Sequence, residues 1–269
     1  MLELGFEKTD YIVGFGGGIV CDITGFVAAT YSRGMNCILV PTTLLSQVDA
    51  AIGGKNGVNL SSYKNIIGTI VQPNIVLCDL GCLKTLPKNE LRNGFAEVIK
   101  HAVIEDAKLF ELLEKNQEAA MNLDDKLMTK IVSESIKIKV GIVSKDEKEN
   151  ELRMKLNFGH SVGHAVEKVA KIAHGEAVAI GMVAEAKISL KRGLISNSEF
   201  DRLKNLIKRF GLPIAIKLSG KRIELIDAVS KDKKKRNGKI KMYLLNGIGK
   251  SLIYEVGFDE IGVALDDLS

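Results

Sequence analysis

The sequence predicts an α/β protein, with a partial, doubly wound parallel sheet in its first part and a mostly α-helical second part. Three short apolar runs bounded by turn residues indicate buried strands, and helical segments alternate with them. After Leu86-Pro87 the pattern changes, because residues 88–211 are almost entirely amphipathic helix with few strand signals. We therefore expect two domains, residues 1–86 and residues 87–269.

The elements of the first part can be assigned in order. A strand is expected at Tyr11–Phe15, and it runs directly into Gly16-Gly17-Gly18. Small and apolar residues over Ile19–Tyr31 then predict a helix. Cys37–Pro41 is the second strand, stopped by its proline, and Asn74–Asp79 is the third. Strands that are apolar throughout and alternate with helices favour a parallel sheet.

The composition is that of an ordinary globular protein. Of the 269 residues 46% are hydrophobic and 26% are charged, and the net charge of +5 fits an anionic small substrate. No aromatic residues are interleaved with basic ones as in single-strand binders, so we expect no nucleic acid partner. No apolar run reaches transmembrane length, and Met1–Asp10 lacks a signal-peptide core, so we expect no membrane partner. The four cysteines lack CxxC spacing, which indicates free thiols in a reducing cytoplasm.

Three of the four histidines lie within fifteen residues, and they indicate a metal site. His160 and His164 share a helix face, and His174 follows at the start of the motif His-Gly-Glu. Far upstream, Glu97 places a carboxylate in an otherwise apolar helical stretch, on one face with Lys100. Imidazoles with one carboxylate suit zinc or a similar divalent ion that keeps one position open for substrate. A lone histidine more often packs in a core, but clustering weakens that alternative.

Two segments of the first part are suited to phosphate groups. The glycine turn lies between a strand and a helix, where a pyrophosphate can approach the helix N-terminus, although the spacing does not match GxGxxG. The stretch Pro41–Asn56 contains two threonines, an acid, two glycines and a lysine, and Lys64-Asn65 follows. A tight turn and a surface loop are the structural alternatives for these two segments.

Taken together, the motifs resemble 3-dehydroquinate synthases of the shikimate pathway, over about Tyr11 to Gly249. The stretches that carry the resemblance are Gly16–Phe26, Tyr31–Gly34, Pro41–Leu45, Asp49, Gly53–Lys55, Lys64-Asn65, Glu97–Lys100, Asn157–His160 and His174–Glu176. The resemblance implies a Rossmann-like NAD-binding part followed by a helical metal- and substrate-binding part.

The activity implied by the resemblance is the conversion of a phosphorylated keto acid, 3-deoxy-D-arabino-heptulosonate 7-phosphate, into 3-dehydroquinate and phosphate. In this family NAD transiently oxidises one alcohol, which acidifies the neighbouring C–H and permits phosphate elimination. The hydride then returns, and an intramolecular aldol step closes the ring. The implied cofactors are NAD and zinc (or cobalt), and the implied assembly is a homodimer in the cytoplasm.

The resemblance also assigns roles by position. The metal ligands are Glu97, His160 and His174. His164 is assigned to proton transfer at the oxidised alcohol, and Lys100 to a place near the metal and the substrate. The substrate carboxylate is assigned to Lys139, Arg153 and Asn157. Asp49 is assigned to the substrate hydroxyls. The phosphate is assigned to Lys55, Asn65, Lys233 and, from the neighbouring subunit, Arg33. The dinucleotide contacts are Gly17, Gly18, Asp22, Thr42, Thr43, Lys64, Thr85, Glu90 and Asn93.

One departure from the family concerns the N-terminus. The family has strands and helices before the glycine turn, on the order of 80 residues, or more than one βαβ unit. Here only Met1–Asp10 precedes the first strand. We therefore expect a chain that lacks the N-terminal part of the NAD-binding domain and whose first strand presents an unpaired edge.

Three other functions remain open from the sequence. Related sugar-phosphate cyclases that form valiolone-type or inosose-type rings lack a substrate carboxylate, and the presence of Lys139, Arg153 and Asn157 argues against them. A metal-dependent polyol dehydrogenase would not need the phosphate-binding lysines. An inactive truncated remnant fits the short N-terminus, but the chain keeps every expected metal ligand.

Overall fold

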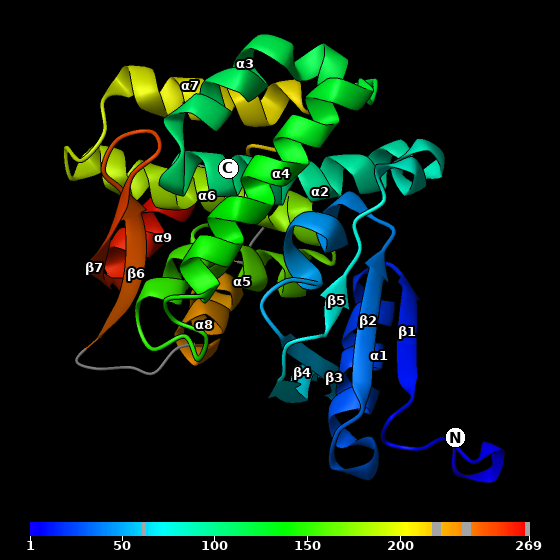
Figure 1. Cartoon of the computed structure of the whole chain (residues 1–269). Helices are drawn as coiled ribbons and strands as arrows, with labels where there is room; N and C mark the ends of the chain where they lie inside the picture. Colours follow the sequence, from blue (N-terminus) through cyan, green and yellow to red (C-terminus); the bar gives the residue numbers. More distant parts are fainter. Residues whose placement is uncertain (61–62, 217–221, 233–237, 267–269) are drawn as a thin grey trace. The chain divides into compact units, whose positions relative to one another are not determined.

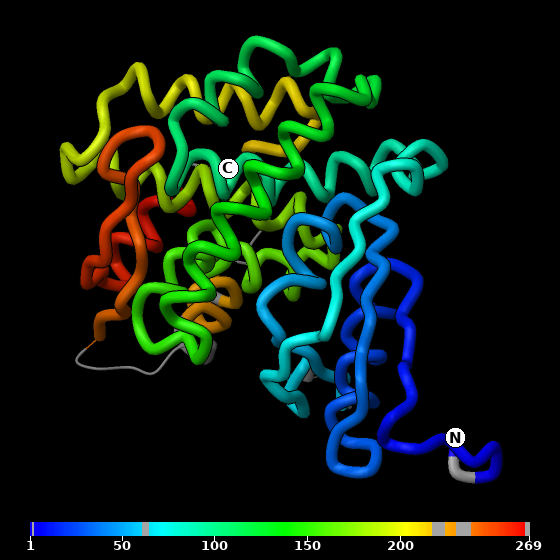
Figure 2. The backbone as a smooth tube through the Cα atoms, viewed as in Figure 1, coloured from blue at the N-terminus to red at the C-terminus, as the bar shows by residue number. Residues whose placement is uncertain are grey.

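The computed structural model describes residues 1–60, 63–216, 222–232 and 238–266, and it divides into two compact units (Figure 1). Unit 1 consists of residues 1–94 and 125–148, and unit 2 of residues 95–124 and 149–269. The chain leaves unit 1 after residue 94 and returns to it for one long helix (Figure 2). The expected division at residues 86 and 87 stays a prediction, because compactness does not tell which residues serve a cofactor or a substrate.

Unit 1 contains all the strands of the parallel sheet, a hairpin and the helices around them. Its elements are η1 (Leu2–Leu4), β1 (Tyr11–Gly16), α1 (Gly18–Thr30), η2 (Tyr31–Arg33), β2 (Asn36–Pro41), η3 (Ser46–Ala50), β3 (Lys55–Leu60), β4 (Tyr63–Ile70), β5 (Ile75–Val76), η4 (Leu80–Thr85), the first turns of α2 (Lys88–Glu105), and α4 (Asp125–Val143).

The predicted parallel sheet is present, in the order β1-β2-β5, with β1 at one edge. Its first two strands agree with the sequence prediction within one residue at each end. The third strand is shorter than predicted, because only Ile75 and Val76 belong to it. Backbone hydrogen bonds on either side, from Asn74 N to Cys37 O and from Leu77 N to Leu39 O, continue the pairing irregularly.

Helix α1 packs against one face of this sheet. Cys21 and Ala28 of the helix form a small core with Cys37 and Leu39 of β2. Close approach is possible because Gly14 lies opposite Thr24, where an added Cβ would be 2.6 Å from the threonine hydroxyl. Side chains that alternate with this buried set point away from the helix. In β1 they remain strongly exposed, with Tyr11 54%, Val13 56% and Phe15 67% accessible.

The antiparallel hairpin of β3 and β4 was not among the elements predicted from the sequence. Its register pairs Lys55 with Ile70 and Val58 with Ile67, and it shifts at an irregularity between Val58 and Leu60. Asn65 lies at this irregularity with a left-handed backbone, φ 49°, which asparagine tolerates better than most residues. The hairpin therefore displays both Lys55 and Asn65.

Unit 2 is mostly helical and is organised around α6. Its elements are the remainder of α2, α3 (Ala107–Met121), η5 (Leu152–Asn157), α5 (His160–Ala170), α6 (His174–Lys191), α7 (Asn197–Arg209), α8 (Arg222–Asp232), β6 (Lys239–Leu245), β7 (Ser251–Gly257) and α9 (Phe258–Asp266). Helix α6 is buried along most of its length and packs against α5, α7, α9 and β6.

The antiparallel pair β6–β7 completes unit 2 and lies beyond the stretch that the sequence predicted to be helical. Its loop is fixed to α2 by the hydrogen bond from Gly249 N to Val103 O, 2.8 Å. Within the described part of the chain, none of the helices combines the length and the apolar character needed to cross a membrane.

Candidate active site

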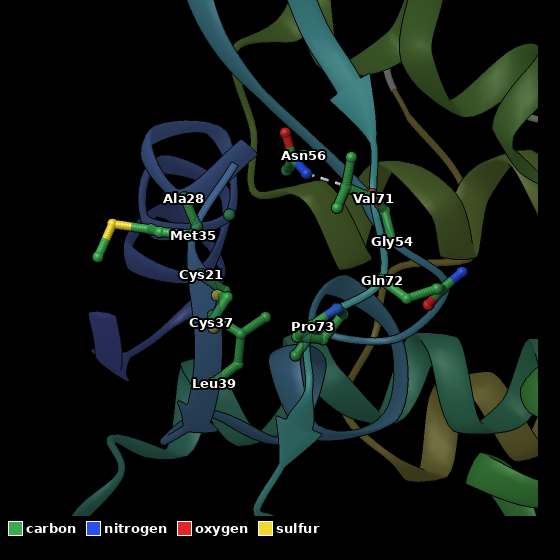
Figure 3. A pocket seen from close by; sticks show the side chains of 12 residues that line it. Cys21, Ala28, Met35, Cys37, Leu39, Gly54, Asn56, Val71, Gln72 and Pro73 are labelled. Atoms are coloured by element: carbon green, nitrogen blue, oxygen red, sulfur yellow. Dashed lines mark hydrogen bonds between the residues drawn. The ribbon is translucent and has the colours of Figure 1, made fainter. Parts of the chain in front are cut away.

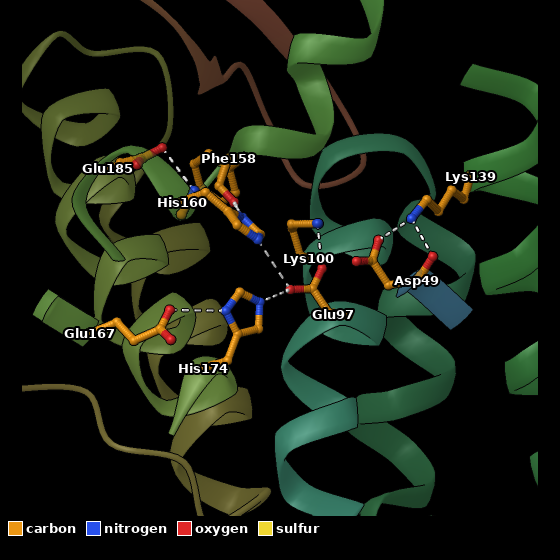
Figure 4. A network of polar contacts seen from close by, with 10 residues as sticks. Asp49, Glu97, Lys100, Lys139, Phe158, His160, Glu167, His174 and Glu185 are labelled. Carbon is orange, nitrogen blue, oxygen red and sulfur yellow. Dashed lines mark hydrogen bonds and ion pairs between the residues drawn. The ribbon is translucent and has the colours of Figure 1, made fainter. Parts of the chain in front are cut away.

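Three residues of unit 2 bring their ligand atoms together as the sequence predicted for a metal. Glu97 comes from the middle of α2, and His160 and His174 are the first residues of α5 and α6 (Figure 4). The Nε2 atoms of both imidazoles lie 3.4 Å from Glu97 Oε1, and all three ligand atoms lie within 4.8 Å of one another. A distance of 3.4 Å is long for a hydrogen bond. It matches two ligands of a tetrahedral zinc, which at about 2.1 Å from the metal are about 3.4 Å apart.

The two histidine helices can approach closely because glycines lie at their contact. Gly159 has φ 80°, a left-handed conformation that favours glycine, and it turns the chain into α5 directly before His160. An added Cβ on Gly181 of α6 would be 1.9 Å from Gly159 O, and one on Gly163 would be 3.0 Å from Ala177 O. The backbones of α5 and α6 therefore pack directly on each other beside the histidines His160 and His174.

The carboxylate of Glu97 is fully buried, and its charge is held there by cations. Burial alone raises the pKa of a carboxyl, but the charge of Lys100, joined by the protonated ring of His174, holds the pKa of Glu97 well below its usual range. Lys100, one turn later on α2, forms an ion pair with Glu97 Oε2. In the described part of the chain, neither Glu97 oxygen accepts a hydrogen bond of normal geometry. A buried carboxylate held by ion pairs alone has the coordination capacity that a divalent metal uses.

The two imidazoles differ in protonation. Burial, with help from Lys100, lowers the pKa of His160 well below its ordinary value, so this ring is neutral and ready to bind a metal. Burial also lowers the pKa of His174, but the neighbouring carboxylates of Glu167 and Glu97 outweigh burial and raise this pKa to about 9. Without metal, His174 is therefore protonated, and its ring lies between the carboxylates of Glu97 and Glu167. A metal ion would replace that proton, so the residues present fit a divalent cation.

Three other predicted residues of unit 2 are described by the structure, His164, Arg153 and Asn157. The ring of His164, one turn after His160, is exposed and its centroid is 5.2 Å from that of His160 and 6.3 Å from that of His174. Arg153 is buried, with 3% of its surface accessible. Asn157 ends η5, and its Nδ2 donates to Glu149 Oε1 at 2.7 Å.

A second polar cluster lies within unit 1 and unites three predicted residues. Lys139 of α4 donates from Nζ to both the backbone oxygen and Oδ1 of Asp49, at 2.5 Å each (Figure 4). Asp49 lies in the π-helical turn η3, a rare form that is frequent at functional sites. Asp22 of α1 faces this pair: burial, and then the charge of Asp49, raise its pKa to about 6, against the opposing effect of Lys139.

The glycine turn of unit 1 lies directly before the first turn of α1. Gly17 directly precedes α1, and within the described part of the chain no side chain caps the first turn of the helix. A Cβ on Gly17 would meet Thr43 Cγ2 at 3.1 Å, and one on Gly18 would touch Ala50. Thr42 N donates to Gly16 O at 2.9 Å, which fixes the strand end beside the turn. The uncapped N–H groups and the narrow approach fit a dinucleotide phosphate.

The other predicted residues of unit 1 lie at element ends. Thr85 ends η4 and is exposed, whereas Glu90 and the buried Asn93 lie one turn apart at the start of α2. Arg33 is exposed in η2. The side chain of Lys64 and the whole of Lys233 lie outside the described residues.

The pocket of unit 1 shown in Figure 3 is not part of the predicted site. It is lined by α1, β2 and the segments around the hairpin, including Cys21, Ala28, Cys37 and Leu39 (Figure 3). None of the residues predicted for the cofactor, the substrate or the metal lines it.

Sequence reasoning missed three acidic residues that contact the site. They are Glu149, which accepts from Asn157, Glu167, which contacts His174, and Glu185 of α6, which accepts from backbone N–H groups at the start of α5. Glu167 could have been found, because it lies three residues after His164 on the same helix. Glu185 gave a clearer signal, as an acid in the apolar run of α6.

Two family models match consecutive parts of the chain. The one described as 3-dehydroquinate synthase N-terminal matches residues 1–93, and the one described as 3-dehydroquinate synthase C-terminal matches residues 94–235. The chain belongs to the 3-dehydroquinate synthase family. The family and the phosphate-eliminating lyase reaction that the motifs predicted are therefore confirmed.

Curated relatives agree with this assignment. The 3-dehydroquinate synthase of Thermodesulfovibrio yellowstonii is 41% identical over 271 residues, which cover 99% of this chain and 76% of the relative. That of Prochlorococcus marinus strain MIT 9312 is 46% identical over 258 residues, 94% of this chain and 71% of the relative.

Solved structures agree on the fold. The 2-epi-5-epi-valiolone synthase of Streptomyces hygroscopicus, solved with NAD+ and Zn2+, superposes with a TM-score of 0.93 at 32% identity, over 100% of this chain and 76% of that one. A 2-deoxy-scyllo-inosose synthase, solved with carbaglucose-6-phosphate, NAD+ and Co2+, gives 0.90 at 27% identity over the same shares. Glycerol dehydrogenase of Schizosaccharomyces pombe, at 17% identity and 0.66, shares the fold alone.

Proposed function

We propose that this chain performs the family reaction on 3-deoxy-D-arabino-heptulosonate 7-phosphate with NAD and a divalent metal, zinc or cobalt, as its cofactors. The observation that carries the proposal is the convergence of Glu97, His160 and His174, each imidazole Nε2 being 3.4 Å from Glu97 Oε1. The fully buried Glu97 and the neutral His160 supply the mixed oxygen and nitrogen ligands of a catalytic zinc, with one position left for substrate.

When bound, the metal lowers the pKa of substrate hydroxyls and polarises the carbonyl formed from one of them, while NAD accepts and returns the hydride. The residues of this chain position the substrate and move protons. We assign His164 to proton transfer at the oxidised alcohol, because its exposed ring lies 5.2 Å from that of His160. We assign Lys100 to keeping Glu97 ionised, through their ion pair, and to the substrate side of the metal.

Further basic residues would bind the two acidic ends of the substrate. We assign the substrate carboxylate to Lys139, Arg153 and Asn157. Arg153 is buried, and a buried guanidinium is suited to bidentate recognition of a carboxylate. Lys139 forms an ion pair with the carboxylate of Asp49, and a substrate hydroxyl or carboxylate would bind beside this pair. We assign the phosphate end to Lys55, Asn65 and Lys233; the first two lie on the hairpin β3–β4.

We assign NAD to residues 1–86 and the start of α2. The glycine turn with Gly17 and Gly18 would take the pyrophosphate, and the threonines that follow β2 lie against it. The full set is Gly17, Gly18, Asp22, Thr42, Thr43, Lys64, Thr85, Glu90 and Asn93. Residues 87–269 would then supply the metal ligands and most of the substrate contacts.

We also propose a homodimer in which Arg33 binds the phosphate of the partner's substrate. Ser32 and Arg33 both have left-handed backbones, φ 47° and 61°, and Gly34 follows with φ 117°. Each non-glycine residue in this region costs about 1–3 kcal/mol, and such strain concentrates at functional turns. Arg33 is exposed at this turn. We further infer a cytoplasmic enzyme, in keeping with its four free cysteines.

The test is release of phosphate from the heptulosonate phosphate by the purified chain with saturating NAD and zinc. We expect release with no net NADH, since the hydride returns to the product. A carboxylate-free heptulose phosphate serves as the second substrate. Phosphate release from that compound alone would replace our assignment by a valiolone-type cyclase, and steady NADH formation would indicate a polyol dehydrogenase. A chain that binds NAD and zinc but releases no phosphate would contradict the proposed activity.

A further inference from the structure

Two carboxylates connect the helices that begin with the metal-site histidines, one in each direction (Figure 4). Glu167 of α5 contacts His174, the first residue of α6. Glu185 of α6 contacts the backbone at the beginning of α5, where His160 lies. Neither residue is among the metal ligands or the substrate residues proposed above.

Glu167 determines which nitrogen of His174 is available. Its Oε2 lies 3.3 Å from His174 Nδ1, while Nε2 of the same ring faces Glu97 Oε1 at 3.4 Å. A ring that donates Nδ1–H to a carboxylate has its lone pair on Nε2, in the tautomer and orientation required for binding a metal. Only 15% of the Glu167 side chain is accessible, so water competes weakly for this contact.

Glu185 fixes the position of the first turn of α5. It is completely buried, and its two carboxylate oxygens accept from Gly159 N at 2.8 Å and from Val162 N at 3.2 Å. The first N–H groups of a helix have no partner within the helix, and a negative charge there also interacts favourably with the helix dipole. Since His160 lies between these two bonded residues, Glu185 restrains the backbone that carries the ligand.

We propose that Glu167 and Glu185 are positioning residues that hold His174 and His160 at the separation a divalent ion needs. The inference rests on the metal site of the proposed function, and it assigns to two further acids the task of supporting that site. Removing such supporting partners of metal ligands typically weakens binding by about 10–100-fold. The contacts on α5 and α6 are reciprocal, so loss of either one releases one histidine of the pair.

The experiment is a zinc titration against a competing chelator on the full chain, with Glu167→Ala, Glu167→Gln and Glu185→Gln. We expect Glu167→Ala to lower zinc affinity by about 10–100-fold, and Glu167→Gln to restore much of it, because the amide oxygen can still accept from Nδ1–H. Glu185→Gln retains one acceptor oxygen for two N–H groups, and we expect about a 10-fold loss. The melting temperature of each zinc-free variant is measured alongside.

The matched control is Glu199→Gln. Glu199 accepts from Ser196 N at 2.8 Å and from Ile248 N at 3.2 Å at the start of α7, a helix without any proposed ligand. We expect this variant to lose thermal stability as Glu185→Gln does, yet to keep the parent's zinc affinity. Equal loss of affinity in Glu199→Gln and Glu185→Gln would overturn the proposal, as would an affinity of Glu167→Ala within twofold of the parent. A parent chain without zinc affinity would instead remove the metal site itself, and the two carboxylates would then have no ligand to support.

Discussion

Replacing Gly181 by alanine should damage the metal site without touching any ligand. The added Cβ would lie 1.9 Å from Gly159 O, whereas ordinary contacts begin near 3.4 Å. A gap of about 1.5 Å must therefore open between α5 and α6, and overpacking of this kind costs about 1–3 kcal/mol or more. Metal–ligand distances tolerate only about 0.2 Å. The required separation of the two helices is several times larger than this tolerance, and it acts at Gly159, the residue directly before His160.

We expect Gly181→Ala to lower zinc affinity by at least about 100-fold, since one imidazole moves out of bonding distance. The assay is the chelator competition described above, together with urea unfolding of the zinc-free protein. Gly141→Ala in α4 is the matched control, because its Cβ would meet nothing within 4 Å. In a helix this substitution should stabilise the chain by about 0.5–1 kcal/mol. Gly163→Ala, with its Cβ 3.0 Å from Ala177 O, should lie between the two.

The order of the three variants is the critical result. If Gly181→Ala folds and binds zinc within twofold of the parent, α5 and α6 can separate without moving their histidines. The reasoning from backbone contact would then be refuted. If Gly141→Ala lost zinc to the same degree, the effect would come from helix α4 or from global stability instead of from the contact at Gly181.

Further predictions address the ligands, the charge cluster and the dimer. His160→Ala should abolish zinc retention through dialysis, whereas Arg153→Ala should keep zinc and raise KM; equal zinc loss in both would contradict the separate roles. For Asp22, with its pKa raised to about 6 from 3.8, the folded state binds the extra proton between these values, so stability falls as pH rises through that window. Asp22→Asn should therefore melt above the parent at about pH 7.5 and show little advantage at about pH 4; a constant difference would refute this. Arg33→Ala and His160→Ala, inactive alone, should regain up to about a quarter of parental activity when co-expressed, because mixed dimers contain one complete site; no recovery would contradict an arginine donated in trans.

The first two strands of the parallel sheet could be predicted because their apolar runs are short and end at glycine or proline. The hairpin β3–β4 could not be predicted, since half of residues 55–60 are polar, one is a glycine, and polar and apolar side chains do not alternate regularly. Those residues become strand through pairing with β4, whose Ile67 and Ile70 supply the stronger propensity. Pairing across sequence is a tertiary effect that a local pattern does not contain.

The metal site was partly visible in the sequence. The spacing of His160 and His164 places both on one helix face, and clustering suggested His174. Glu97 lies more than sixty residues away, and it stood out as a carboxylate in an apolar helical stretch before the family motif assigned it as a ligand. The contacts of the two carboxylates that hold the histidines could not be predicted. Glu185 stands out as an acid in an apolar run, but only the packing of α6 against α5 shows that it is buried on backbone N–H groups.

The exposed face of the β1-β2-β5 sheet affects how this protein can be measured. Tyr11, Val13 and Phe15 form an apolar row along a strand whose outer edge carries backbone groups without a neighbouring strand in the described sheet. Fluorescent dyes that report unfolding by binding apolar surface will already bind this face in the folded protein. Dye-based melts of the chain should therefore begin from a bright baseline and lose contrast. Far-ultraviolet circular dichroism, which follows the helices of both units, is the suitable probe for the comparisons of stability above.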